Sequence, residues 1–173
     1  MIGNPHRYAL ELHWTGNRGK GTSGYRAYDR SYDLSAGGKP ALAGSADATF
    51  RGDRAKWNPE EMLLGALSSC HMLSYLHVCA DAGINVVAYR DAPDGSMELR
   101  TDGSGRFTEV TLRPHVVVAE GSDPETAQIL HHLAHEKCFI ANSVNFAVHC
   151  QATINVRTAH ATELPTLHLQ EAV

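Results

Sequence analysis

Hydrophobic and polar residues alternate in several short segments of this chain, a pattern typical of strands with one buried face. Residues 106–120 show the clearest alternation, although Pro114 interrupts it. Because proline lacks an amide donor, we expect this strand to lie at a sheet edge or to carry a bulge. The other predicted strands cover residues 8–14, 25–34, 41–50, 85–90, 96–100 and 148–156.

The segment 58–83 differs from the others because it has no polar face. Asn58 is a favourable N-cap, Pro59 suits the first helical position, and Glu61 completes a capping box. Gly83 is suited to the left-handed residue that closes a helix. Apart from histidines, no charged side chain occurs between Glu61 and Asp81. We therefore predict a central helix that is buried on most of its sides.

A second helix is predicted to begin at Pro124, after the capping sequence 122–123, and to continue to about Lys137. It is interrupted near Cys138 and resumes over residues 142–146. Strands grouped before and between two helices indicate an α+β fold with antiparallel sheets, not a doubly wound parallel sheet. We expect one domain over residues 1–157 and a C-terminal tail over residues 158–173.

Composition excludes several classes of function. The 173 residues carry a net charge of −4 with scattered basic residues, which disfavours nucleic-acid binding. The uncharged stretch 62–80 is long enough to span a membrane, but its serines, tyrosine and histidines would be costly in hydrocarbon. The N-terminal segment has no secretory signal. We expect a soluble cytoplasmic protein that binds neither membranes nor nucleic acid.

Four cysteines without a C-x-x-C pair leave three hypotheses open. In the first, Cys70 is a redox nucleophile and Cys138 is its partner. In the second, Cys138 binds zinc together with histidines of the second predicted helix. In the third, the cysteines are small buried hydrophobic residues, which we expect for Cys79 and Cys150. The histidines of the zinc hypothesis are His131, His132 and His135.

The redox hypothesis requires a thiolate at neutral pH, and burial in the middle of a helix opposes its formation. A nearby arginine, Arg51 or Arg18, would stabilise it, with Glu60 or Glu61 holding the arginine in place. Glu60 lies ten residues before Cys70, about 15 Å along the helix. The two can share a site if a second copy of the helix runs antiparallel beside the first. We therefore predict a two-fold homodimer.

Three segments resemble the OsmC/Ohr family of thiol-dependent hydroperoxide reductases. NPEEMLLGALSSCHML, at residues 58–73, is similar to the family's NPEEL…A…AC motif. HWTGNRGKGT, at residues 13–22, resembles its opening WxG…GKGT segment, and AHEKCFIAN, at residues 134–142, resembles AHxxCPxSN. The resemblance implies an OsmC-like fold, an intertwined homodimer with a central buried helix, and reduction of organic hydroperoxides in oxidative or osmotic stress defence.

The resemblance also implies roles for individual residues. Cys70 corresponds to the peroxide-attacking thiol, Cys138 to the thiol that resolves the sulfenic acid as a disulfide, and Glu60 to the carboxylate that positions an arginine. That arginine is Arg51 if the chain is of OsmC type, as its longer second and third strands favour. Arg18 and Arg54 are the alternatives.

Members of this family are re-reduced by dithiols such as lipoylated proteins and need no bound cofactor or metal. Phe139 departs from the family pattern because it stands where proline is usual. The alternative function is a small-molecule-binding or stress-related module on the same fold, without peroxidase activity.

Overall fold

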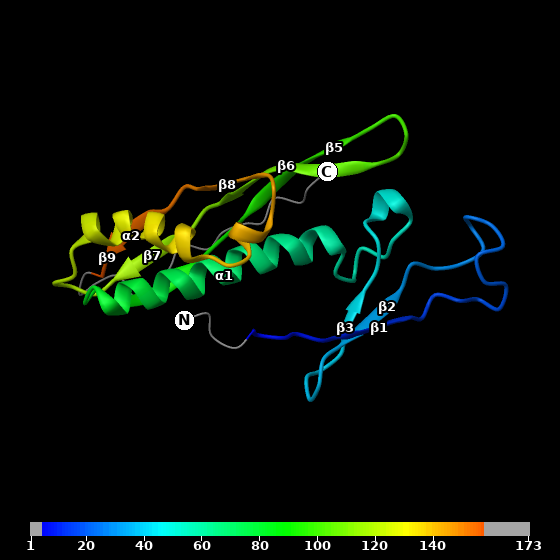
Figure 1. The fold of residues 1–173 in the computed structure, drawn as a ribbon, viewed down its shortest axis with the longest axis horizontal. Helices are drawn as coiled ribbons and strands as arrows, with labels where there is room; N and C mark the ends of the chain where they lie inside the picture. The colour runs from blue at the N-terminus through cyan, green and yellow to red at the C-terminus, as the bar shows by residue number, and fades with distance from the viewer. Residues whose placement is uncertain (1–4, 158–173) are drawn as a thin grey trace. The chain divides into compact units, whose positions relative to one another are not determined.

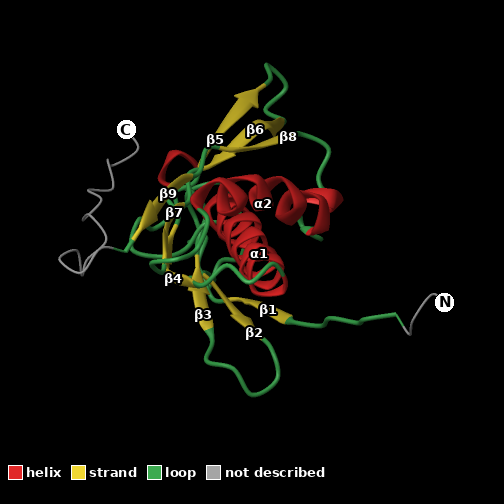
Figure 2. Cartoon of the chain, turned by 90° about the vertical axis from the view of Figure 1, so that its left-hand side faces the viewer, coloured by secondary structure: helices red, strands yellow, loops and turns green. Residues whose placement is uncertain are grey.

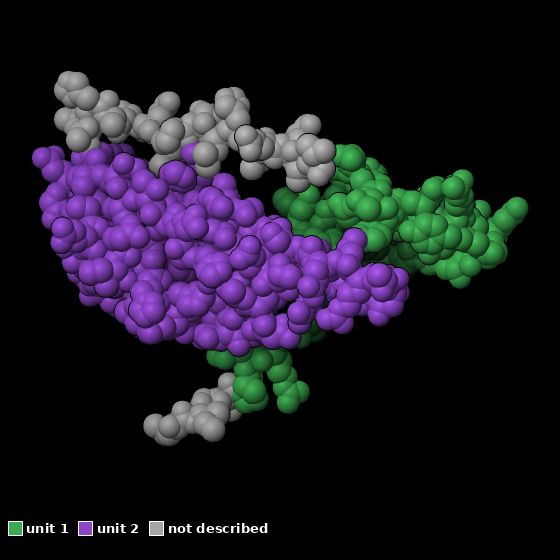
Figure 3. Space-filling model, turned by 90° about the horizontal axis from the view of Figure 1, so that it is seen from above, with its two compact units in different colours: residues 1–63 green, residues 64–173 purple. Residues whose placement is uncertain are grey.

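The computed structural model of this protein describes residues 5–157, so the predicted tail 158–173 lies outside the described residues. The chain divides into two compact units, residues 1–63 and residues 64–173 (Figure 3). The predicted single domain over residues 1–157 stays a prediction.

The first unit contains one antiparallel sheet of order β1-β2-β3 (Figure 1). Its strands are shorter than the sequence predicts, and the predicted strand 41–50 turns into a short 3₁₀-helix, η1, after three residues. The Asp47 side chain caps this turn by accepting a hydrogen bond from the Thr49 amide at 2.7 Å. The elements are β1 (Glu11–Trp14), β2 (Tyr32–Ser35), β3 (Leu42–Gly44) and η1 (Ala48–Phe50).

The prediction of a strand over residues 25–34 is wrong for most of its length because Arg30 holds its first half in a loop. The Arg30 guanidinium lies 4.3 Å from the ring centres of both Tyr25 and Tyr28. It also donates hydrogen bonds of 2.7 Å to the carbonyls of the same two residues. Carbonyls bonded to a side chain are not free to join a strand ladder.

Helix α1 (Pro59–Asp81) has the predicted ends. The Asn58 side chain accepts a hydrogen bond from the Glu61 amide at 2.8 Å, and the Glu61 carboxylate accepts one from the Asn58 amide at 3.2 Å. This reciprocal pair confirms the capping box. Gly83 has the left-handed φ of 73°, which confirms the predicted C-terminal closure.

The prediction that α1 is buried on most sides is wrong for the single chain. Its buried residues form mainly one stripe, and only 28% of its most apolar 18-residue stretch is buried. Leu73, on the opposite face, is 63% exposed. By length and composition alone α1 could cross a membrane, a test that the core helix of a soluble protein also passes. The buried residues are Leu67, His71, Tyr75, Val78 and Cys79.

The second unit holds two three-stranded sheets, of order β4-β7-β9 and β5-β6-β8. In each, the first pair is antiparallel, as predicted, and the second pair is parallel, so both sheets are mixed. The strands are β4 (Val86–Arg90), β5 (Asp94–Leu99), β6 (Gly105–Leu112), β7 (His115–Val118), β8 (Ala147–Cys150) and β9 (Thr153–Val156).

The parallel pairs arise because both long predicted strands break and continue in the other sheet. Pro114 separates β6 from β7, each of which is the middle strand of its sheet, so the expected edge position is wrong and the chain crosses between the sheets at Pro114. The last strand breaks at residues 151–152 in the same way. Hydrogen bonds of 2.8 Å join the two crossing points, from the Gln151 amide to the Leu112 carbonyl and from the Thr153 amide to the Pro114 carbonyl. The alternative expectation of a bulge fits β6, whose register with β5 shifts between Ser96 and Met97. The overall architecture is α+β, as predicted.

Helix α2 (Pro124–Lys137) begins at the predicted cap, and it ends at Cys138 before a 3₁₀ turn, η2 (Ala141–Ser143). Figures 1 and 2 show α2 running across α1, with β7 and β9 beside it. The Tyr75 hydroxyl of α1 donates a 3.0 Å hydrogen bond to the Ala127 carbonyl of α2. The Tyr75 ring also stacks on His131, with ring centres 3.8 Å apart. These contacts fix the two helices against each other.

Two histidines lie in this helix interface. His71 and His131 are both buried, and their ring nitrogens Nε2 and Nδ1 lie 3.0 Å apart. Burial lowers the pKa of His71 to about 4 and that of His131 to about 3, because the charged form of each ring loses its hydration. A neighbouring histidine adds a smaller effect in the same direction: His135 lowers the pKa of His71, and His71 lowers that of His131. Both rings are therefore neutral at physiological pH.

These two histidines should make the fold sensitive to acid. Their folded-state pKa values lie below the ordinary 6.5, so the unfolded chain binds more protons below that pH. Stability present above pH 6.5 is lost as pH falls toward 4. Urea unfolding with a metal chelator present should show a loss on the order of 2 kcal/mol per histidine between about pH 7.5 and about pH 5.

The matched comparison is His131→Gln against His132→Gln, which changes an exposed neighbour on the same helix. We expect the first variant to have a smaller pH dependence than the native chain and the second to keep it. Equal stability of the native chain at both pH values would contradict the prediction.

Candidate functional site

The middle of α1 and the end of α2 bring two thiols together in the second unit. Cys70 is half-buried in α1, and Cys138 is fully buried at the C-cap of α2. Cys70 contributes to a raised pKa of the Cys138 thiol, which indicates that the two side chains are neighbours. The two residues are far apart in sequence, so this proximity depends on the packing of the helices.

A compact turn holds Cys138 in place. Its carbonyl accepts a 3.0 Å hydrogen bond from the Asn142 amide, and its sulfur accepts one from the Ala141 amide at 3.5 Å. The Ser143 hydroxyl donates to the Phe139 carbonyl at 2.7 Å. Phe139, the departure from the family pattern, is 78% exposed. Its side chain therefore does not pack over the thiol.

The two thiols of this pair are chemically unequal. The pKa of Cys138 is raised to about 11, mainly by burial; the hydrogen bond from the Ala141 amide opposes this rise, and the adjacent Cys70 adds to it. Cys138 is consequently a protonated thiol at neutral pH. Its S–H group is therefore available as a hydrogen-bond donor toward the Cys70 side chain.

Glu60 lies in the first turn of α1, within the first unit. Its Oε2 atom is buried and has no hydrogen-bond partner among the described residues. The Tyr32 hydroxyl is likewise buried and has no hydrogen-bond partner among the described residues. Burial raises the pKa of Tyr32, and the negative charge of Glu60 raises it further. A buried carboxylate oxygen without a partner is unfavourable, so this position suits a cationic side chain.

Arg51 also lies in the first unit, after η1, with the left-handed φ of 66° that non-glycine residues seldom adopt. Its amide donates to the Ala48 carbonyl at 3.0 Å, and a side chain at Gly52 would clash with the Ala46 carbonyl at 1.5 Å. This tight loop fixes the backbone of Arg51. Within residues 5–157, the structure shows no hydrogen bond or ion pair for its guanidinium, and none with Glu60.

The alternative arginines differ in their local partners. Arg18 donates to the Arg26 carbonyl, and its Nε lies 3.7 Å from the Asp29 carboxylate. The pKa of Asp47 is lowered mainly by hydrogen bonds from Thr49, and only slightly by the charge of Arg54. Of the three arginines, Arg18 is the one whose guanidinium is held by local partners within residues 5–157.

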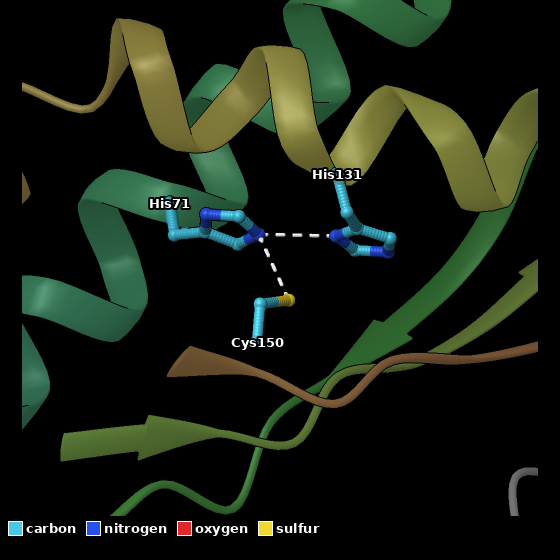
Figure 4. Close-up of side chains that lie close together, drawn as sticks. All are labelled: His71, His131 and Cys150. Atoms are coloured by element: carbon cyan, nitrogen blue, oxygen red, sulfur yellow. Dashed lines mark hydrogen bonds between the residues drawn. The ribbon is translucent and has the colours of Figure 1, made fainter. Parts of the chain in front are cut away.

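A second cluster was not predicted from the sequence: His71, His131 and Cys150 meet inside the second unit (Figure 4). The Cys150 sulfur lies 3.6 Å from His71 Nε2, and the three candidate ligand atoms lie within 4.8 Å of one another. Burial raises the pKa of Cys150 to about 11, and the Asp91 carboxylate adds to this. No sequence spacing links residues on α1, α2 and β8, so no local pattern could have identified the cluster.

The predicted zinc ligands do not gather as expected. His131 faces His71 and Cys150, whereas Cys138 faces Cys70. His132 is exposed and lies 3.3 Å from the Glu136 carboxylate.

A pocket of about 360 Å³ opens beside α2 and β8. Its lining residues are Gln128, His131, His132, His135, Val148, His149 and Cys150.

Comparison with known proteins identifies several relatives. An OsmC-like protein of Vibrio cholerae has a structure similar to this chain at a TM-score of 0.78 and 31% identity, covering 86% of this chain and 100% of its own. An organic hydroperoxide resistance protein of Elizabethkingia anophelis shares the fold at a TM-score of 0.62 and 18% identity, covering 88% of this chain and 99% of its own. YmaD, an uncharacterized protein of Bacillus subtilis, is 23% identical over 155 residues, which are 88% of this chain and 95% of YmaD.

The family model described as OsmC-like protein matches residues 52–153, which include α1, α2 and both thiols of the Cys70–Cys138 pair. This match covers more than half of the chain. The protein therefore belongs to the OsmC-like family.

Proposed function

We propose that this protein is a thiol-dependent peroxidase that reduces organic hydroperoxides to alcohols. The observation that carries the proposal is that Cys70 and Cys138 are neighbours within the second unit. Membership of the OsmC-like family supports it, as do fold relatives named organic hydroperoxide resistance proteins. Two neighbouring thiols can pass from dithiol to disulfide without a large rearrangement of the chain.

The first step is nucleophilic attack by the Cys70 thiolate on the terminal peroxide oxygen. A sulfur–oxygen bond forms, the oxygen–oxygen bond breaks, and the leaving alkoxide takes up a proton to become the alcohol. Cys70 is then a sulfenic acid, oxidised by two electrons. Cys138 assists before this step because its protonated thiol can donate a hydrogen bond to the thiolate.

In the second step Cys138 attacks the Cys70 sulfenic sulfur. A disulfide forms, and the hydroxyl leaves as water with the proton of the Cys138 thiol. Reduction by an external dithiol, such as that of a lipoylated protein, returns both cysteines to thiols by exchange through a mixed disulfide. This cycle requires no bound cofactor, and it suits the reducing cytoplasm.

Arg51 and Glu60 complete the proposed site. An arginine beside Cys70 would favour the thiolate and stabilise the developing alkoxide, since its charge is permanent. The unpartnered Glu60 oxygen would hold that guanidinium through a charge-assisted hydrogen bond. We assign the role to Arg51 because its loop is fixed and its guanidinium is not engaged by the described residues.

We further propose that the working unit is a homodimer in which α1 pairs with its copy. The face of α1 opposite the buried stripe carries Gly65, Ser69 and Leu73 at four-residue spacing, all exposed. Small residues permit two helices to approach closely, and Leu73 supplies apolar surface to bury. An antiparallel pair would also bring the start of one α1 toward the middle of the other, where Cys70 lies.

The thiol chemistry predicts a specific count after one equivalent of cumene hydroperoxide. The reduced native chain should lose two thiols, Cys138→Ser should lose one and retain a sulfenic acid, and Cys70→Ser should lose none. Free-thiol titration and intact mass after dimedone trapping measure these counts. Cys79→Ala, in the core away from the pair, should behave as the native chain. Retention of all four thiols in the native chain would contradict peroxidase activity.

The arginine assignment predicts a difference between two substitutions. Arg51→Gln should lower the second-order rate of peroxide consumption at least about tenfold, equivalent to about 1.4 kcal/mol of lost transition-state stabilisation. Arg18→Gln should change it less than about twofold, because Arg18 has local partners. Stopped-flow kinetics at fixed pH provide the measurement. Equal rates for Arg51→Gln and the native chain would remove Arg51 from the site.

The proposed assembly predicts a two-chain mass in sedimentation velocity. Leu73→Glu should shift the protein toward one chain, because it would bury two carboxylates in an apolar contact. Ile129→Glu introduces the same charge on α2 at a residue that is 71% exposed, and it should leave the mass unchanged. A one-chain mass for the native protein would refute the dimer.

A further inference from the structure

The cluster of His71, His131 and Cys150 is separate from the proposed peroxide chemistry and requires its own explanation. Within the described residues, it is the group whose imidazole and thiol donor atoms converge on one point (Figure 4). We propose that these three side chains bind one zinc ion per chain. The proposal goes beyond the peroxidase function, since it uses neither Cys70 nor Cys138 as a ligand.

The distances are close to those of a tetrahedral zinc site. Zinc bonds of about 2.0–2.1 Å to nitrogen and about 2.3 Å to sulfur place tetrahedral ligand atoms about 3.3–3.6 Å apart. His71 Nε2 lies 3.0 Å from His131 Nδ1 and 3.6 Å from the Cys150 sulfur. All three atoms lie within 4.8 Å of one another. The two separations that involve His71 Nε2 therefore lie within a few tenths of an ångström of the tetrahedral values.

The rigidity of the surroundings favours a preformed site. The three ligands come from α1, α2 and β8, which belong to one compact unit. The His131 ring is held by stacking on Tyr75, with the ring planes 9° apart. Tyr75 is itself fixed by its hydrogen bond to the Ala127 carbonyl. Ligands already held in place lose little conformational entropy when an ion binds.

The ligand types indicate which ion is favoured. Two imidazoles and one thiolate are ligands that zinc accepts readily, whereas magnesium and calcium prefer oxygen atoms. The pocket of about 360 Å³ reaches both His131 and Cys150. The fourth coordination position therefore faces a space that admits water or an external ligand. Three protein ligands with one open position distinguish this site from closed structural zinc sites.

The experiment uses the full chain, reduced and freed of metal with a chelator. Zinc is titrated in competition with a chromophoric chelator, and cobalt(II) is added separately as a spectroscopic probe. We expect one ion per chain and a thiolate-to-cobalt charge-transfer band. Cys150→Ser should abolish the band and weaken zinc binding at least about tenfold, since loss of even an outer-shell partner weakens metal binding by that factor.

The matched control is His132→Gln against His131→Gln, which are adjacent on α2 and differ in burial: His132 is exposed and His131 is buried. Only His131→Gln should weaken zinc binding. Cys138→Ser should keep both the band and the affinity, which separates this site from the peroxide chemistry. Circular dichroism shows whether each variant is folded.

A native protein that gives no thiolate band with cobalt would overturn the proposal without any variant. Zinc binding that is lost in His132→Gln and kept in Cys150→Ser would also overturn it, because it would indicate exposed histidines only. Neither result depends on whether peroxide is consumed.

Discussion

The packing of α1 against α2 is the constraint on which the rest of the second unit depends. The Tyr75 hydroxyl bonds to the Ala127 carbonyl, and the Tyr75 ring stacks on His131. This contact sets which residues of the two helices face each other. His71 meets His131, and two turns further along α2 Cys138 meets Cys70. One helix interface thus positions both the thiol pair and the histidine cluster.

Local signals in the sequence predicted the features that local interactions determine. The capping box at Asn58, the closure at Gly83 and the cap of α2 at Asp123 involve residues within a few positions of one another. The prediction of a strand over residues 25–34 was wrong because a side chain competes for the backbone carbonyls. Alternation indicates a strand, but the Arg30 guanidinium provides the carbonyls of Tyr25 and Tyr28 with other partners, and nothing in the alternation reveals that competition.

Contacts between residues far apart in the sequence could be predicted only where a family motif includes both residues. The residues alone left the pairing of Cys70 with Cys138 as one of three hypotheses, and the family resemblance selected it, because no spacing rule connects residues so far apart. Cys150 fitted a buried hydrophobic residue on an alternating strand, and His131 fitted a metal site with its own helix neighbours. The actual grouping depends on β8 pairing in parallel with β6, and the break near residues 151–152 that produces this register has no local signature.

The absence of a charged face on α1 has a physical explanation. One stripe of the helix packs inside the second unit, and a helix with only this task would carry charged residues on its opposite side. Instead the opposite side has Gly65, Ser69 and Leu73, which are exposed in the single chain. Small residues beside one exposed leucine leave an uncharged surface on which a second helix can pack closely. The composition of α1 therefore supports the proposed pairing of α1 with its copy.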